Sequence, residues 1–200
     1  MGFTLYKPNK GNKGSLLDFS FTSKGDKKGI FANFVAQNGW DQQARGGEGN
    51  GIFKDGKKLG VKLSVYEVGE IINAIERRED GPAKGFYHKS ESGSTQIYFK
   101  RYKGKVKDGD KWVEGPDYTG YSFSAVKGED RFNVPITFGE VRALKEYLCF
   151  CLEKIFGGIL SDEIQRAKEY AAKAKPQTGE GSPPKSVESF VSSEEEEPPF

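Results

Sequence analysis

Two segments of the chain share one order of apolar and polar positions. In residues 131–152 a short apolar run leads into Thr137 and Glu140, which have the T-x-x-E spacing of a capping box. Apolar side chains then recur at three- and four-residue steps, the period of a helical face. Ser64 and Glu67 have the same spacing in the first half of the chain and are also followed by such a face. Each segment therefore predicts a strand that turns directly into a capped helix.

Alternating apolar and polar residues predict further strands before each of these helices. Such alternation is typical of a strand with one buried face. Together with the strand that opens residues 131–152, each half of the chain reads as about four strands followed by a helix, which predicts an α+β fold. The predicted strands lie at 15–21, 29–36, 59–63, 85–89, 95–102 and 120–126.

Composition changes at both ends of the chain. The first residues are basic and rich in Gly and Asn, and the last are rich in Pro, Gly, Ser and Glu, a composition that cannot bury a core. Gly157 and Gly158 predict the end of the second helix, and Ser161 predicts the cap of a separate one. The expected organisation is a mobile basic arm at 1–14, a folded domain at 15–160, a C-terminal helix at 161–175 and a disordered acidic tail at 176–200.

Charge is unevenly distributed along the chain. The net charge is +2, yet the segment from Pro176 to the end holds one cation and six acids, a net charge of −5. The first 175 residues carry 30 cations and 23 acids, a net charge of +7. The pattern to be explained is a basic body with an acidic tail.

Several classes of protein are excluded by the sequence. Cys149 and Cys151 lie two positions apart in a predicted helix and cannot pair, which excludes a disulfide-built secreted domain. The sequence shows neither a signal-peptide run nor the roughly 20 apolar residues that a membrane span requires. We therefore expect a cytoplasmic protein, associated with a nucleoid or a viral replication site, and no membrane partner.

Several segments, in their order and spacing, resemble the Whirly family of single-stranded DNA-binding proteins over roughly residues 15–158. The segments are Lys28–Phe31 with Phe34 and Trp40, Leu63–Gly69, Phe86–His88, Tyr121–Val126, Asn133–Thr137 and Gly139–Glu140. The resemblance implies two four-stranded antiparallel sheets packed crosswise, each followed by a helix. It also implies a homo-oligomer, a tetramer or dimer, formed through the helices. An OB-fold carrying the same tail is the alternative fold.

The end of the chain carries a second resemblance. Ser193–Phe200 is similar to the acidic tip of bacterial and phage single-stranded DNA-binding proteins. That resemblance implies a partner-binding peptide that recruits replication, repair or recombination proteins. The residues concerned are Glu194, Glu195, Glu196, Glu197, Pro198, Pro199 and Phe200.

The predicted strand at 95–102 is the leading candidate for binding single-stranded DNA. One of its faces presents Gln96, Tyr98, Lys100 and Tyr102. Tyrosine rings can stack on unpaired bases while lysines meet phosphates, and each stacked base contributes roughly 1–3 kcal/mol without a sequence requirement. Further candidates are Tyr87, Lys89, Trp40, Lys28 and Lys13.

Catalytic and cofactor signals are weak. His88 is the only histidine, so no metal site with histidine or cysteine spacing is predicted. The glycine-rich stretch Gly46–Gly51 lacks the lysine of a phosphate-binding loop. We expect a protein that is not an enzyme and holds no cofactor. Two other functions stay open: an RNA-binding or transcription-regulating protein of the same sheet architecture, and an oligomeric structural or adaptor protein whose tyrosine strand contacts another subunit.

Overall fold

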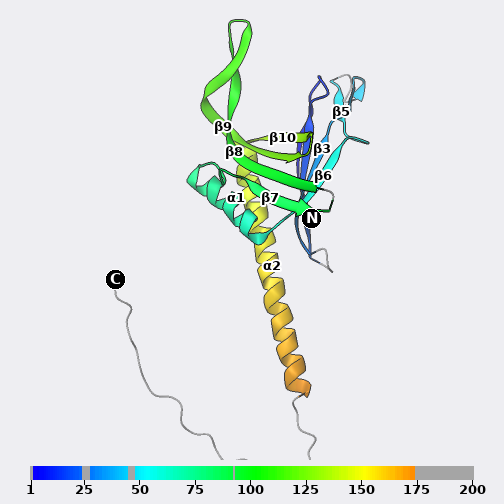
Figure 1. The fold of residues 1–200 in the computed structure, drawn as a ribbon, viewed down its shortest axis with the longest axis vertical. Helices are drawn as coiled ribbons and strands as arrows, with labels where there is room; N and C mark the ends of the chain where they lie inside the picture. The colour runs from blue at the N-terminus through cyan, green and yellow to red at the C-terminus, as the bar shows by residue number, and fades with distance from the viewer. Residues whose placement is uncertain (1, 24–27, 45–47, 92, 174–200) are drawn as a thin grey trace, which may run out of the picture. The chain divides into compact units, whose positions relative to one another are not determined.

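The computed structural model describes residues 2–23, 28–44, 48–91 and 93–173. It contains two four-stranded antiparallel sheets, each followed by a helix, which confirms the predicted α+β fold. In Figure 1 the strands of the second sheet run across those of the first. The first sheet has the order β1 (Gly2–Lys7), β2 (Ser15–Thr22), β3 (Gly29–Ala36), β6 (Lys58–Leu63). The second has the order β10 (Asp130–Thr137), β9 (Lys111–Lys127), β8 (Gly93–Asp108), β7 (Phe86–Ser90).

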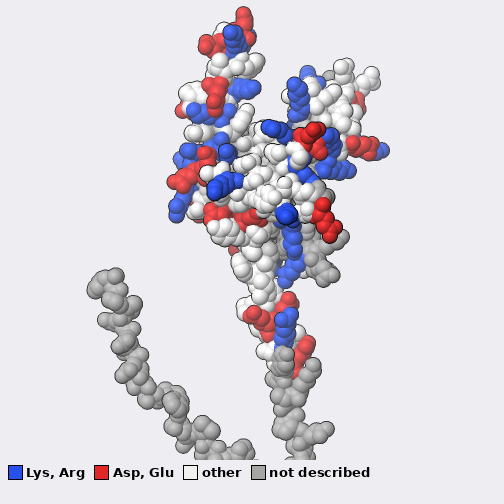
Figure 2. Space-filling view, viewed as in Figure 1, with Lys and Arg blue, Asp and Glu red and all other residues white. Residues whose placement is uncertain are grey.

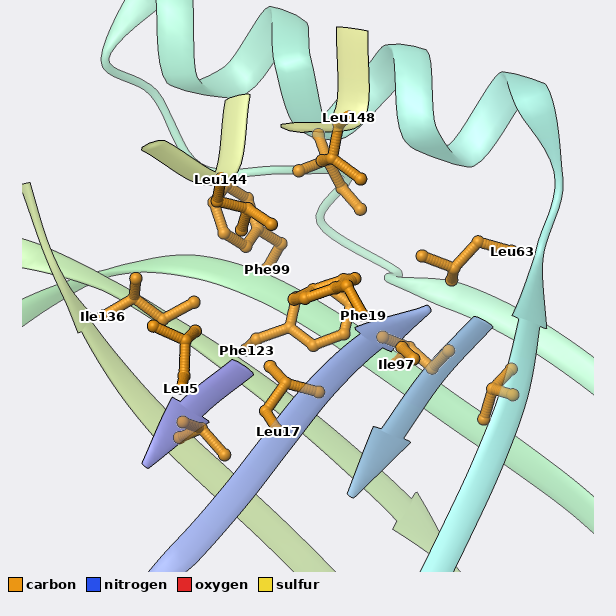
Figure 3. Packing of buried hydrophobic residues seen from close by; sticks show 14 of the residues in the cluster. Leu5, Leu17, Phe19, Leu63, Ile97, Phe99, Phe123, Ile136, Leu144 and Leu148 are labelled. Atoms are coloured by element: carbon orange, nitrogen blue, oxygen red, sulfur yellow. The ribbon is translucent and has the colours of Figure 1, made fainter. Parts of the chain in front are cut away.

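Aromatic side chains fill the space between the sheets. Phe34 of the first sheet stacks on Phe123 of the second with ring centroids 5.6 Å apart, and Phe19 meets Phe123 at 5.4 Å. Figure 3 shows Phe19, Phe99 and Phe123 converging there. Each of these side chains is at most 1% exposed. Because neighbours along a strand point to opposite faces, burial of one face leaves the other free.

Both helices begin at the predicted capping boxes. Before α1 (Val65–Arg77), Ser64 N–H donates to Glu67 Oε2 at 2.7 Å, and Glu67 N–H donates back to Ser64 Oγ at 3.2 Å. Before α2 (Phe138–Lys173), Thr137 and Glu140 make the same exchange at 2.8 and 3.4 Å. These bonds satisfy N–H groups that a helix start would otherwise leave unpaired. The apolar faces then close the core with Val68, Ile71, Ala74, Val141, Leu144, Leu148 and Cys151.

The prediction of a mobile arm at 1–14 is wrong for Gly2–Lys7. These residues pair with β2 along their whole length and supply the fourth strand of the first sheet. Leu5 is 3% exposed and belongs to the core. The strand was missed because its apolar alternation is short and lies among Gly, Asn and Lys residues.

The prediction of a separate helix at 161–175 is also wrong as far as the described residues reach. Helix α2 is continuous from Phe138 to Lys173, and neither Gly157 nor Gly158 adopts a left-handed conformation. Ser161 caps nothing, since its hydroxyl donates to the Gly157 carbonyl one turn earlier at 2.8 Å. An interior glycine costs about 1 kcal/mol relative to alanine, which good helix formers on both sides can offset.

Three further features differ from the expectations. The glycine-rich stretch after β3 contains a small ladder of β4 (Gly39–Asp41) and β5 (Asn50–Ile52). Strands β8 and β9 continue well beyond 95–102 and 120–126. The OB-fold alternative is wrong, because a five-stranded barrel does not account for two four-stranded sheets with a helix after each. Among the described residues, no helix has the length and apolar character to cross a membrane.

Candidate nucleic-acid interface

The face of the second sheet that points away from the core gathers polar and aromatic side chains from all of its strands. We call it the outer face. Register places Tyr98 beside Ser124, and Ser124 beside Asn133. In the next rows Lys100 lies beside Ser122, and Tyr87 lies beside Gln96. Side chains directly opposite on antiparallel strands are about 4.5–5.5 Å apart at Cβ, so these rows form one surface.

The Tyr98 ring is held in place by its surroundings. Gly85 adopts a positive φ of 65°, and a Cβ there would lie 2.2 Å from the Ile97 carbonyl and 2.8 Å from the Tyr98 ring. Only glycine allows the backbone to pass this close. On the same face the Lys100 ammonium lies 5.2 Å from the centre of the Tyr98 ring, within cation–π range. Tyr98 is half-buried and Lys100 is exposed, so an aromatic ring and a cation are offered together.

Charge on the outer face has one sign. In the rows of the described sheet from Lys89 and Ser94 to Tyr102 and Gly120, the outward side chains include Lys89, Lys100 and Arg131 but no Asp or Glu. Small hydroxyl side chains, Ser122 and Ser124, lie between the tyrosines and the β10 residues. The surface therefore attracts an anion, and the side chains that β9 contributes at Ser122 and Ser124 are short.

The other tyrosines of the predicted site also lie on this face. Tyr87 is 62% exposed and stands next to Gln96, diagonal to Tyr98, and Lys89 follows on the same strand. Tyr102 lies opposite Gly120, in the last pair before a register shift. Because glycine has no side chain, Tyr102 has no side-chain neighbour at the directly opposite position of β9.

Lys13 is distant in sequence but reaches the edge of this face. It lines a groove of about 370 Å³ together with Tyr6 of the first sheet and Asn133 and Pro135 of β10. Asn133 is in the same row as Tyr98. The outer face therefore runs from β7 to β10, and the groove extends it beyond β10 to the loop between β1 and β2.

Two of the predicted residues lie elsewhere. Trp40 belongs to β4, on the small ladder, with Gly49 so close to its indole that a Cβ would lie 2.4 Å from Nε1. The Lys28 ammonium lies against Gly158 of α2, where a Cβ would be 3.1 Å from it. Neither residue is on the outer face, so the structure does not bring them to the tyrosines.

Sequence reasoning missed the contributions of β9 and β10. Arg131 completes the row that begins at Tyr87, Ser124 and Asn133 complete the row of Tyr98, and Ser122 lies in the row of Lys100. Period-2 alternation would place each of them on the side opposite Phe123 and Val134, but only the register shows which neighbours they meet.

His88 occupies a supporting position rather than the surface. Its Nε2 lies 2.8 Å from Oε1 of Glu67, the carboxylate that closes the capping box of α1. Within the described part of the chain no cluster of three or more His, Cys, Asp or Glu side chains is arranged to hold a metal ion. The predicted partner-binding residues Glu194 to Phe200 lie outside the described residues.

No protein-family model and no curated protein sequence matches the chain. Among solved structures, the chain is similar to the Trypanosoma MRP1/MRP2 proteins, with a TM-score of 0.48 and 14% identity over 78% of this chain and 86% of that one. It is similar to the plant transcriptional regulator PBF-2, with a TM-score of 0.46 and 17% identity over 90% of each chain. WHY1 from Arabidopsis thaliana gives a TM-score of 0.44 and 16% identity over 90% of this chain and 97% of that one. Function is therefore inferred from the side chains of the outer face.

Proposed function

We propose that this protein binds single-stranded DNA without strong sequence preference, through the outer face of the second sheet. The observation that carries the proposal is the joint presence of Tyr87, Tyr98 and Tyr102 with cations, on a face whose rows from Lys89 to Tyr102 hold no acidic side chain among the described residues. The sequence resemblance to the Whirly family supports it. A protein of this kind would protect exposed strands.

The chemistry of the face fits unpaired nucleotides better than a duplex. Every base has a ring surface that can stack on a tyrosine, and the stacking energy depends little on which base it is. Lys89 and Lys100 would meet phosphates, while the serines between the strands leave room for the backbone. Stacking on these tyrosines requires exposed base faces, which a duplex keeps stacked within its own helix.

The test is a fluorescence-anisotropy titration of a labelled oligo-dT at several salt concentrations. We expect Tyr98→Ala and Tyr87→Ala to weaken binding on the order of tenfold, since each removes one stacking platform. Tyr66→Ala is the matched control, because Tyr66 is 75% exposed and belongs to α1 rather than to a strand of the outer face. If all three variants bind as the wild type does, the outer face is not the site.

The same titration separates the alternative functions. RNA of matched sequence and duplex DNA serve as competitors, and tighter binding of RNA would favour the RNA-binding alternative. A structural or adaptor protein would show no salt-dependent affinity for any of them. The DNA proposal requires log affinity to fall with log salt by about 0.7 per phosphate contact.

We further propose that the acidic tip recruits replication, repair or recombination proteins and competes with DNA for the basic body. A tethered acidic segment acts at a high effective concentration. Deleting Ser192–Phe200 should therefore tighten DNA binding at low salt and abolish capture of partner proteins by the immobilised chain. Unchanged affinity and unchanged capture would contradict this role.

We also propose that the protein is a homo-oligomer that associates through its helices. Support comes from large apolar side chains of α2 that are left exposed: Phe156 at 57%, Ile159 at 44% and Leu160 at 59%. Light scattering should give a particle mass of more than one chain, and Leu160→Glu should reduce that particle mass.

Finally, we propose that the chain is not an enzyme. An end-labelled oligonucleotide should stay intact on incubation with it.

A further inference from the structure

Strands β8 and β9 continue past the edge of the second sheet as a two-stranded ribbon. Strand β7 pairs with β8 only as far as Ile97, and β10 pairs with β9 only from Gly120 onward. Residues Lys103–Tyr118, which we call the arm, pair only with each other in the described structure. Figure 1 shows the arm projecting from the sheet next to the β8 and β9 labels.

The arm exposes side chains that its own fold does not bury. Trp112 is 67% exposed, Val106 45%, Tyr118 41% and Val113 38%. A lone two-stranded ribbon is marginally stable in water, so an uncovered tryptophan near its tip contributes little to folding. A large amphipathic ring kept in this position is suited to contact with a ligand.

Register sorts the charges of the arm by face. Lys105 lies opposite Glu114 and Lys107 opposite Trp112, which places these four side chains on one face, while Lys103 and Tyr118 pair across a register shift at the base of the arm. The face holds two lysines and one acid. The remaining charged residues are Lys103, Asp108, Asp110, Lys111 and Asp117, so the arm as a whole has no net charge. Figure 2 accordingly shows blue and red side chains interleaved along it.

Cations already contact the aromatic ring at the base of the arm, Tyr118. The Lys103 ammonium lies 5.3 Å from the centre of the Tyr118 ring, and the Arg101 guanidinium lies 4.3 Å from it. Farther out, Lys107 and Trp112 are cross-strand neighbours. The arm thus repeats, on a second surface, the pairing of aromatic rings with cations that the outer face shows at Tyr98 and Lys100.

We propose that the face of the arm formed by Lys105, Lys107 and Trp112 is a second contact site for single-stranded nucleic acid. This inference rests on the proposed function of the outer face. A base would stack on Trp112 while Lys105 and Lys107 meet phosphates. Charge complementarity selects a polyanion, because the lysines outnumber the acid on this face. A strand long enough to reach both sites gains affinity, since the second contact is made within one complex.

The two tryptophans allow the arm to be tested separately from the outer face. In a Trp40→Phe variant, Trp112 is the only tryptophan of the chain. We titrate this variant with oligo-dT of increasing length and record Trp112 fluorescence beside the anisotropy of the labelled oligonucleotide. Short oligonucleotides should bind with little quenching, and longer ones should bind more tightly and quench Trp112.

Substitutions in the arm give the matching affinity test. Lys105→Gln with Lys107→Gln should weaken binding of long oligonucleotides, and should lower the salt slope by roughly 0.7 for each lysine. Lys111→Gln, on the other face of the arm, is the control and should change neither. Circular dichroism melting should be unaffected by all three substitutions, because these side chains are exposed.

The outcomes distinguish the two proposals. The arm site is overturned if anisotropy shows binding at every oligonucleotide length, Trp112 is not quenched, and the double lysine variant binds as the wild type does. That result leaves the proposal for the outer face intact. Equal quenching by duplex DNA overturns the assignment to single strands. An altered particle mass for Trp112→Ala, with unchanged affinity, identifies the arm as a contact between subunits instead. Absence of binding by the wild type overturns both proposals.

Discussion

Lys100→Gln gives the most direct measurement of the proposed interface. Lys100 is exposed, 5.2 Å from the centre of the Tyr98 ring, and shares the outer face with two other cations. If its ammonium meets one phosphate, the substitution removes one contact and makes the slope of log affinity against log salt shallower by about 0.7. A fourfold rise in salt should then shrink the affinity difference between wild type and variant by about 2.6-fold.

The assay is the anisotropy titration of a labelled oligo-dT, run at four or more salt concentrations for each protein. Lys100→Arg tests whether charge is what matters, and it should keep the wild-type slope. Lys168→Gln is the matched control, since this lysine is exposed on α2 and outside both sheets. Parallel lines for wild type and Lys100→Gln would refute the reasoning, even if the variant bound more weakly, because they would show that no phosphate contact had been lost.

Three further predictions concern the fold that positions the interface. Phe123→Ala should lower the free energy of unfolding by about 3–5 kcal/mol in chemical denaturation, since this ring fills the space between the sheets. Gly157→Ala should raise stability by about 0.5–1 kcal/mol and keep the helical signal, whereas a helix that ended there would be unaffected or destabilised. Burial opposes the charged form of Glu140, but hydrogen bonds from Lys7 and Thr137 outweigh it and hold its pKa below the ordinary 4.5. Because the folded pKa is the lower one, this stabilisation is present above pH 4.5 and is lost as the pH falls through the folded value. Glu140→Gln should therefore destabilise the protein at pH 7, and a difference in unfolding free energy that did not shrink in acid would contradict this.

The helix starts were predictable because a capping box is a local structure. Ser64 and Glu67 are three residues apart, and the two hydrogen bonds that they make close within that segment. The same holds for Thr137 and Glu140. The face of β8 was predictable for a similar reason, since alternation along one strand already separates Tyr98 and Lys100 from Phe99.

Helix continuity and the first strand were decided by packing. Two consecutive glycines weaken a helix by only about 2 kcal/mol, an amount that neighbouring residues can offset. Strand β1 has only a short apolar alternation, and it forms because Leu5 can be buried beside β2. Neither effect can be read from a local sequence pattern.

The sequence alone therefore determined two capped strand-to-helix units, the α+β class and the aromatic and basic face of one strand. The tertiary structure decided which side chains share that face. It placed Ser124 and Asn133 beside Tyr98, brought Lys13 to the edge of β10, and kept Trp40 and Lys28 away from the tyrosines. The physical reason is that capping and alternation act within a few residues. Register and sheet packing depend on contacts between residues far apart in the chain.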